Sequence, residues 1–93
     1  MKILTVCGMG FGTSLMLLMT IQDIGKKHGI KVDGEATDLG SAKGRDCDLI
    51  VASSEIAKEL KDEPVEVISI KNLLDKEEIE AKVLPALKKF SQK

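Results

Sequence analysis

The chain has 93 residues, the length of one domain rather than two. With 14 basic and 15 acidic residues it has a formal net charge of -1, which excludes the basic excess typical of nucleic-acid-binding proteins. Two Phe, with no Tyr and no Trp, also exclude a base-stacking surface for single strands. The longest apolar run, Leu15–Met19, is far shorter than the ~20 residues that cross a bilayer. We therefore expect one cytoplasmic domain, residues 1–93, that neither spans a membrane nor binds nucleic acid.

Apolar segments that favour strands alternate with segments of helical period. Strands are predicted at Lys2–Val6, Ile30–Ala36, Asp48–Ala52 and Val65–Ile70. Helices are predicted from Leu15 to about Lys27 (closed by His28-Gly29), from Ser53 or Ser54 to about Lys61, and from an Asp75–Glu78 capping box to about Phe90. Residues 38–45 read as a loop or short helix, and Pro85 is expected to kink or break the last helix.

This alternation predicts an α/β fold. We expect a three-layer sandwich with a four-stranded parallel sheet of order 2-1-3-4 and helices on both faces. The two most apolar strands, the first and third, take the central places. Ligands of such sheets bind beyond the carboxyl ends of the strands. That edge is expected to hold residues 7–14, Asp38, Ser53-Ser54 and Lys71-Asn72.

A glycine-rich turn follows the first predicted strand. Its residues are Cys7, Gly8, Met9, Gly10, Phe11, Gly12, Thr13 and Ser14, the last two where a helix N-cap belongs. Backbone N–H groups of such a turn and a helix N-terminus both favour an anion and a nucleophilic thiolate. The pattern indicates a phosphate-binding loop, Gly8–Ser14, around a nucleophilic Cys7. The simpler interpretation is a buried structural cysteine before a turn that needs glycine.

Three chemistries compete for this loop. Dinucleotide binding requires G-x-G-x-x-G, a spacing that Gly8, Gly10 and Gly12 do not have. A cysteine phosphatase uses Cys-x5-Arg, but Thr13 stands at the arginine position and Arg45 lies elsewhere. Phosphoryl relay needs no such arginine, because the group must be kept from water until an acceptor arrives. A small cysteine phosphatase and a non-catalytic anion- or nucleotide-binding module remain as alternatives.

Three motifs resemble a known family: CGMGFGTS at 7–14, DLIVASSEIA at 48–57 and IKNLLD at 70–75. They resemble the IIB component of a bacterial phosphoenolpyruvate-dependent sugar phosphotransferase system (PTS), and most of all its ascorbate-type, galactitol-related branch. The resemblance covers nearly the whole chain. It implies a phosphocysteine at Cys7, a phosphohistidine donor on a IIA protein, and a sugar or ascorbate held by a membrane IIC transporter as acceptor, with no cofactor and no metal. Mannitol-type relatives carry an acidic residue after the cysteine, from which Gly8 departs, and cellobiose- and lactose-type relatives carry a different loop.

The first predicted helix has apolar residues on two sides. Its core positions by helical period are Leu17, Leu18, Ile21 and Ile24. Leu15, Met16 and Met19 fall on roughly the opposite arc, and with Met9 and Phe11 they are predicted to form a partner-docking collar around the thiolate. The alternative is that a neighbouring helix covers part of this arc.

The remaining rare residues are given structural roles. His28 lies at the far end of the first helix, where a histidine usually complements the helix dipole. Cys47 precedes the third strand, at the sheet edge opposite to Cys7, so we predict no disulfide between them. Ser53, Ser54 and Asn72 lie near the site edge and are more typical of caps and loops than of phosphate ligands.

Overall fold

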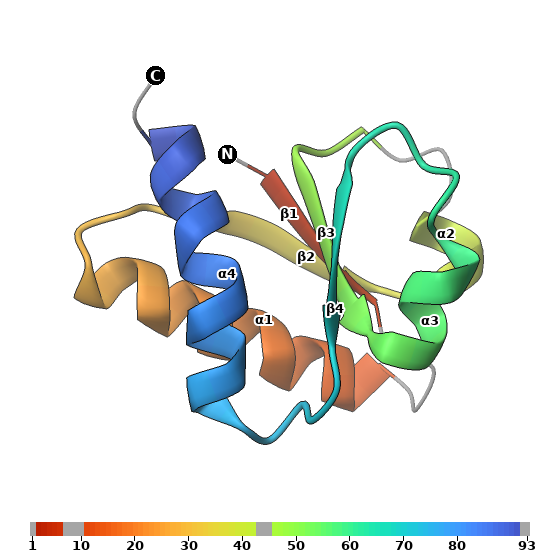
Figure 1. Ribbon diagram of the computed structural model, residues 1–93, viewed down its shortest axis with the longest axis horizontal. Coiled ribbons are helices and arrows are strands. Elements are labelled where there is room, and N and C mark those ends of the chain that lie inside the picture. The colour runs from red at the N-terminus through yellow and green to blue at the C-terminus, as the bar shows by residue number, and fades with distance from the viewer. Residues whose placement is uncertain (1, 7–10, 43–45, 92–93) are drawn as a thin grey trace.

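The structure, a computed structural model, describes residues 2–6, 11–42 and 46–91, with only the backbone given for Phe11, Ser41, Phe90 and Ser91. The elements in chain order are β1 (Lys2–Val6), α1 (Phe11–Lys27), β2 (Asp33–Thr37), α2 (Leu39–Ala42), β3 (Leu49–Ser53), α3 (Ser54–Glu59), β4 (Glu66–Ile70) and α4 (Lys76–Ser91). The strands form one parallel sheet of order β2-β1-β3-β4 (Figure 1). The predicted fold class and strand order are confirmed.

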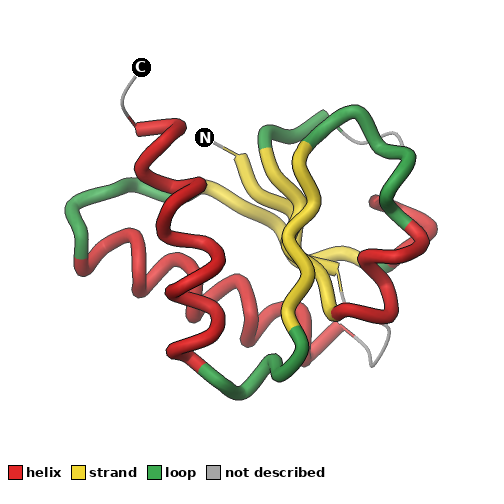
Figure 2. The backbone as a smooth tube through the Cα atoms, viewed as in Figure 1, coloured by secondary structure: helices red, strands yellow, loops and turns green. Residues whose placement is uncertain are grey.

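Helices cover both faces of the sheet, as Figures 1 and 2 show. Alternate side chains of β1 enter two separate cores. Ile3 packs with the buried residues of α1 and α4, among them Ile21 and Val83. Leu4 packs on the other face with Ala42 of α2 and Leu60, which follows α3. Because successive side chains of a strand point to opposite faces, this division follows from the run KILTV itself.

The edge strand β2 is shorter at its start than predicted, because it begins at Asp33 rather than Ile30. In the register of the sheet, Asp33 pairs with Lys2, the first residue of β1. Val32 is buried and Ile30 half-buried by packing on the α1–α4 core, without pairing in the sheet. The predicted alternation of buried and exposed side chains is nevertheless present. Gly34 permits the close packing of α1, since a Cβ there would lie 2.5 Å from Cδ1 of Leu18.

Helix α1 begins at Phe11, four residues before the predicted start at Leu15. Thr13 and Ser14 therefore lie within its first turn, and the prediction that they occupy the N-cap is wrong. The C-terminal prediction is confirmed: Gly29 has φ of 74°, and the N–H of Ile30 donates to the carbonyl of Gly25 over 2.7 Å. Among the described residues, no helix is long and apolar enough to cross a membrane.

Helix α4 runs unbroken through Pro85, so the expected break is absent. Proline removes the N–H that would bond to the carbonyl of Ala81. Both residues are exposed on the solvent side of the helix, where water can hydrate that carbonyl. At the start of α4, the Asp75 carboxylate accepts hydrogen bonds from the N–H groups of Glu77 and Glu78, over 3.1 and 3.2 Å, which confirms the predicted cap.

Candidate active site

The carboxyl ends of the four strands lie at one edge of the sheet. Val6 pairs with Thr37 of β2 and with Ala52 of β3, and Ser53 pairs with Ile70 of β4. The residues that follow these strands therefore meet at this edge, as the order of the sheet predicted. These include the start of α1, the Ser53-Ser54 pair and the Lys71-Asn72 pair.

The first turn of α1 supplies hydrogen-bond donors at this edge. The N–H groups of a helix's first turn have no carbonyl partner within that helix, and they carry its positive dipole end. This turn begins at Phe11 and contains no acidic residue, so no carboxylate of its own competes for an anion. The preceding loop residues Cys7, Gly8, Met9 and Gly10 lie outside the described residues. The chain joins them to β1 on one side and α1 on the other.

A buried hydrogen bond ties the end of β1 to this turn. The hydroxyl of Thr5 donates to the carbonyl of Ser14 over 2.7 Å, and both residues are fully buried. The Ser14 side chain thus lies inside the fold, whereas Gly12 is exposed and Thr13 half-buried. The sequence alone does not distinguish Thr5, because a threonine within an apolar run is typical of any strand.

An open hollow of about 650 Å³ lies beside the turn. Its polar lining includes Thr13 of α1, Ser53 and Ser54 at the β3–α3 junction, and Lys71 and Asn72 after β4. Ser53 has the backbone of an α3 N-cap, but its side chain makes no capping hydrogen bond. The hydroxyls expected at this edge thus line a common space.

The loop between β4 and α4 forms one wall of that hollow. Its N–H groups at Lys71 and Asn72 donate to the two carboxylate oxygens of Glu78, over 2.8 and 2.9 Å. The Asn72 side-chain oxygen accepts from the N–H of Leu74 over 3.0 Å, the loop role expected for it. Glu78 therefore stabilises this loop instead of completing the predicted capping box, since the N–H of Asp75 donates to the carbonyl of Asn72.

The negative charge of Glu78 is stabilised by these two N–H groups and by a lysine of α4. The ammonium of Lys82 donates to Glu78 over 2.7 Å, and it also donates to the carbonyl of Ser69 in β4 over 2.9 Å. The hydrogen bond from Lys82, followed by those from the N–H groups of Lys71 and Asn72, lowers the pKa of Glu78 from 4.5 to about 2.

The predicted division of α1 into two apolar sides is confirmed. Leu17, Leu18, Ile21 and Ile24 are buried, whereas Leu15, Met16 and Met19 have exposed fractions of 41%, 55% and 55%. Among the described residues, no neighbouring helix buries these three. Leu74, in the β4–α4 loop, is exposed by 74% and lines the hollow together with Met16. Leu74 was not predicted from the sequence, because only the fold brings the loop beside α1.

Two of the residues given structural roles lie away from this edge. Cys47 precedes β3, at the amino end of the sheet, and is a half-buried free cysteine; the predicted absence of a disulfide involves Cys7, which lies outside the described residues. Burial raises the pKa of its thiol, which disfavours the reactive thiolate. His28, beyond α1, lies 3.0 Å from the carboxylate of Glu80 in α4, so it joins two helices. This hydrogen bond, together with the charge of Lys27, lowers the pKa of Glu80.

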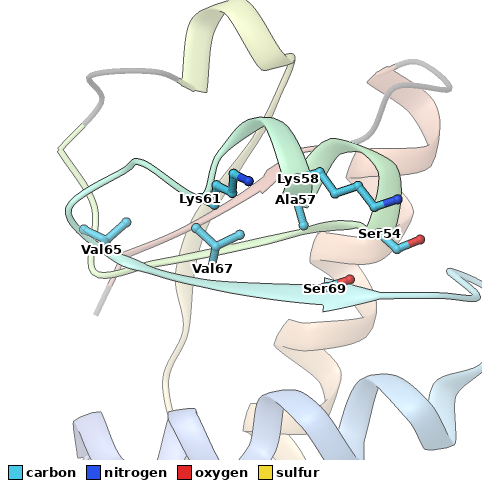
Figure 3. A pocket seen from close by; sticks show the side chains of 7 residues that line it. All are labelled: Ser54, Ala57, Lys58, Lys61, Val65, Val67 and Ser69. Atoms are coloured by element: carbon cyan, nitrogen blue, oxygen red, sulfur yellow. The ribbon is translucent and has the colours of Figure 1, made fainter.

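A second, more open hollow of about 490 Å³ lies between α3 and β4 (Figure 3). Val67 points from β4 toward α3, and Val65 lies just before that strand. Lys58 of α3 and Lys61, which follows α3, extend from the other side, and Ser54 and Ser69 lie at the carboxyl end. Ser54 lines both hollows. The first hollow is the one that adjoins the start of α1.

Comparisons with known proteins agree with this fold. The family described as "PTS system, Lactose/Cellobiose specific IIB subunit" matches residues 2–84. A protein of Mycoplasma pneumoniae named "Ascorbate-specific PTS system EIIB component" is 29% identical over 82 residues, covering 85% of this chain and 86% of its own. The lactose-specific IIB domain of the PTS from Streptococcus pneumoniae superposes with a TM-score of 0.61 at 18% identity, covering 99% of this chain and 95% of its own.

The fold class is thus that of a parallel α/β domain of the IIB type. The chain belongs to the PTS IIB family, and it is a phosphotransferase component of that system. The predicted resemblance is confirmed. A IIB component works with IIA and IIC components of the same system.

Proposed function

We propose that Cys7 carries a phosphoryl group from a IIA protein to a substrate bound by a IIC transporter. The carboxyl-edge position of α1 carries this proposal. Its first turn supplies backbone donors and no carboxylate, and it directly follows the segment that Cys7 begins. An anion attached to that segment would be stabilised by these donors.

The transfer takes two steps. In the first, the Cys7 thiolate attacks the phosphorus of a phosphohistidine; the S–P bond forms, the N–P bond breaks, and the histidine nitrogen keeps the electron pair. In the second, a substrate hydroxyl attacks the phosphorus, the S–P bond breaks, and the hydroxyl proton is released. Backbone N–H groups of Gly8–Ser14 bind the phosphoryl oxygens in both steps. Because Ser14 is buried, Thr13 rather than Ser14 supplies the side-chain hydroxyl from the first turn of α1 to the hollow.

The residues that surround the cysteine also favour a carrier over a phosphatase. The only arginine of the chain, Arg45, is far in sequence from the loop, and Thr13 stands where a phosphatase has its arginine. Without a guanidinium on the transferring group, water attacks the phosphocysteine slowly. A carrier needs this stability because its acceptor arrives separately.

The exposed apolar collar is proposed to dock the donor. It comprises Met9, Phe11, Leu15, Met16 and Met19, of which the last three are exposed on α1. Partners that meet only briefly use apolar patches of this kind, and Met side chains adapt to more than one surface. The Mycoplasma relative, named as ascorbate-specific, supports ascorbate as the substrate that the transporter presents. The domain would then act at the cytoplasmic side of that transporter.

The test is incubation of the full chain with a phosphorylated IIA protein, followed by intact mass and phosphorus NMR. A carrier gains one phosphoryl group with a thiophosphate resonance, and it releases little inorganic phosphate in the absence of transporter and substrate. Continuous turnover of an aryl phosphate would instead establish the phosphatase. The IIA protein used must be one that phosphorylates another IIB component. If this chain then shows neither phosphoryl uptake nor turnover of an aryl phosphate, the carrier and the phosphatase are both contradicted, and a binding module remains.

A further inference from the structure

The β4–α4 loop, residues 71–75, is built by contacts that a simple connection between a strand and a helix does not need. Two of its N–H groups, at Lys71 and Asn72, bind separate oxygens of one carboxylate, Glu78. Two more hydrogen bonds lie within the loop, from the N–H of Leu74 to the Asn72 side chain and from the N–H of Asp75 to the Asn72 carbonyl. The backbone between Lys71 and Asp75 is therefore held at four points.

Glu78 is itself held in place. Lys82, one helical turn further along α4, donates to Glu78 over 2.7 Å and to the β4 carbonyl of Ser69 over 2.9 Å. This ammonium fixes the carboxylate with respect to the end of β4 as well as to the loop. Charge-assisted hydrogen bonds of this kind are stronger and more directional than neutral ones.

These contacts present an apolar side chain to solvent. Leu74 is exposed by 74%, the largest fraction among the exposed large apolar residues that the structure describes. A loop without a partner surface gains nothing from exposing leucine, since burial of its side chain would be favourable. Leu74 lines the same hollow as Met16 of the collar. The loop thus continues the apolar surface of α1 across the hollow.

We propose that Glu78 is a positioning residue for donor docking: it holds the β4–α4 loop so that Leu74 extends the apolar collar on which the IIA protein docks. This inference rests on the proposed function and adds a second element to its docking surface. The IIA protein is the favoured occupant, because a donor must reach the start of α1, and Leu74 and Met16 lie at the rim of the hollow beside it. Glu78 itself does not touch the transferred group.

The wild type, two test variants and one control variant are compared in a phosphoryl-uptake assay at varied concentrations of phosphorylated IIA protein. Glu78→Gln removes the second carboxylate oxygen, so one of the two loop N–H groups loses its acceptor, and Leu74→Ser removes the apolar side chain alone. We expect each variant to raise the KM for the donor about fivefold, with kcat within about twofold of wild type. The matched control is Glu80→Gln, because Glu80 is also a paired carboxylate of α4, but its partners are Lys27 and His28. It should keep the wild-type KM.

The double variant Glu78→Gln/Leu74→Ser separates positioning from general weakening. If Glu78 acts through Leu74, the double variant has the KM of Leu74→Ser alone, because the position of a missing side chain no longer matters. If the two effects multiply, Glu78 does not act through Leu74 and the proposal is wrong. Amide exchange at Lys71 and Asn72 should be faster in Glu78→Gln than in Glu80→Gln.

The outcomes also distinguish this inference from the proposed function. If the wild type takes up no phosphoryl group, both are wrong. If the wild type takes it up and Glu78→Gln keeps the wild-type KM, only the inference is wrong. If the variant impairs only the later transfer to transporter-bound substrate, the loop docks the transporter, and the assignment to the IIA protein is contradicted.

Discussion

The two ends of the parallel sheet place their polar residues in different environments. At the amino end, Lys2 and Asp48 are joined by two hydrogen bonds of 2.8 Å, and the Cys47 thiol is half-buried beside them. At the carboxyl end, the hydroxyl-bearing residues Thr13, Ser53 and Ser54 line an open hollow. The amino end is thus closed by polar contacts, whereas the carboxyl end leaves its hydroxyls accessible to a ligand. A cysteine before a strand packs, and we propose that a cysteine after a strand reacts.

We expect the largest effect on phosphoryl uptake from substitutions in the exposed apolar surface at the carboxyl end of the sheet. The double variant Met16→Ser/Met19→Ser should lower the rate of phosphoryl uptake at low donor concentration about tenfold, because two exposed contact residues are lost. Both side chains are more than half exposed, so thermal unfolding should stay near that of the wild type. Lys31→Ser, an exposed change at the amino end, is the control and should leave uptake unaltered. An unchanged rate in the double variant would contradict the docking role of the collar.

We expect a smaller effect, on stability, from the hydrogen bond that joins β1 to the first turn of α1. Thr5→Val removes the buried hydrogen bond to Ser14 and should lower the free energy of unfolding by about 1 kcal/mol, measured by urea denaturation. Thr20→Val is a matched control, because the Thr20 hydroxyl makes a solvent-exposed hydrogen bond to the Met16 carbonyl within α1. It should cost clearly less. Equal losses in the two variants would mean that burial adds nothing to the Thr5 contact.

The amino end can be tested through its thiol. In a Cys7→Ser background, only Cys47 reacts with an alkylating reagent. Burial is the largest cause and raises the pKa of this thiol; a hydrogen bond with the Leu49 backbone lowers it by less, and the charges of Asp48 and Asp46 raise it slightly further. The midpoint of the rise in alkylation rate with pH should therefore lie at a higher pH than for a cysteine in the urea-unfolded chain. A pH midpoint of Cys47 alkylation at or below that of the unfolded chain would contradict the claim that burial at the amino end suppresses the reactivity of this thiol.

We expect the smallest effect from Glu78, which holds the β4–α4 loop, on the free energy of unfolding at low pH. Because the pKa of Glu78 is depressed in the folded state, its stabilisation is fully present above pH 4.5 and is lost as pH falls through about 2. The free energy of unfolding of the wild type should thus fall more steeply over this range than that of Glu78→Gln. Glu80, whose pKa is also lowered, contributes equally to both proteins and cancels. Parallel profiles would show that Glu78 is not stabilised in its charged form.

The sheet was predictable from sequence because its pattern is local and repeated. β3 reads as a continuous apolar run because both of its faces are covered, and β2 alternates because it lies at the edge. Strand order followed from placing the two most apolar strands at the centre. The residues at the carboxyl edge followed in turn, since parallel strands bring their ends together.

What sequence did not predict depends on contacts between distant elements. Thr13 and Ser14 are good capping residues, yet α1 begins earlier, where the buried contact between Thr5 and Ser14 ties its first turn to β1. Glu78 stands at the position of a capping box but instead binds N–H groups six and seven residues away. The exposure of Leu74 follows from that loop. Pattern recognition favours the nearest partner in sequence, and in these cases tertiary geometry supplied another.

The central claim is that the cysteine after β1, and not the cysteine before β3, carries the phosphoryl group. Its most direct test is phosphorylation by the IIA protein of three chains, the wild type, Cys7→Ser and Cys47→Ser, with intact mass measured for each. The account predicts one added phosphoryl group on the wild type and on Cys47→Ser, and none on Cys7→Ser. Uptake by Cys7→Ser, or its loss in a folded Cys47→Ser, would contradict it.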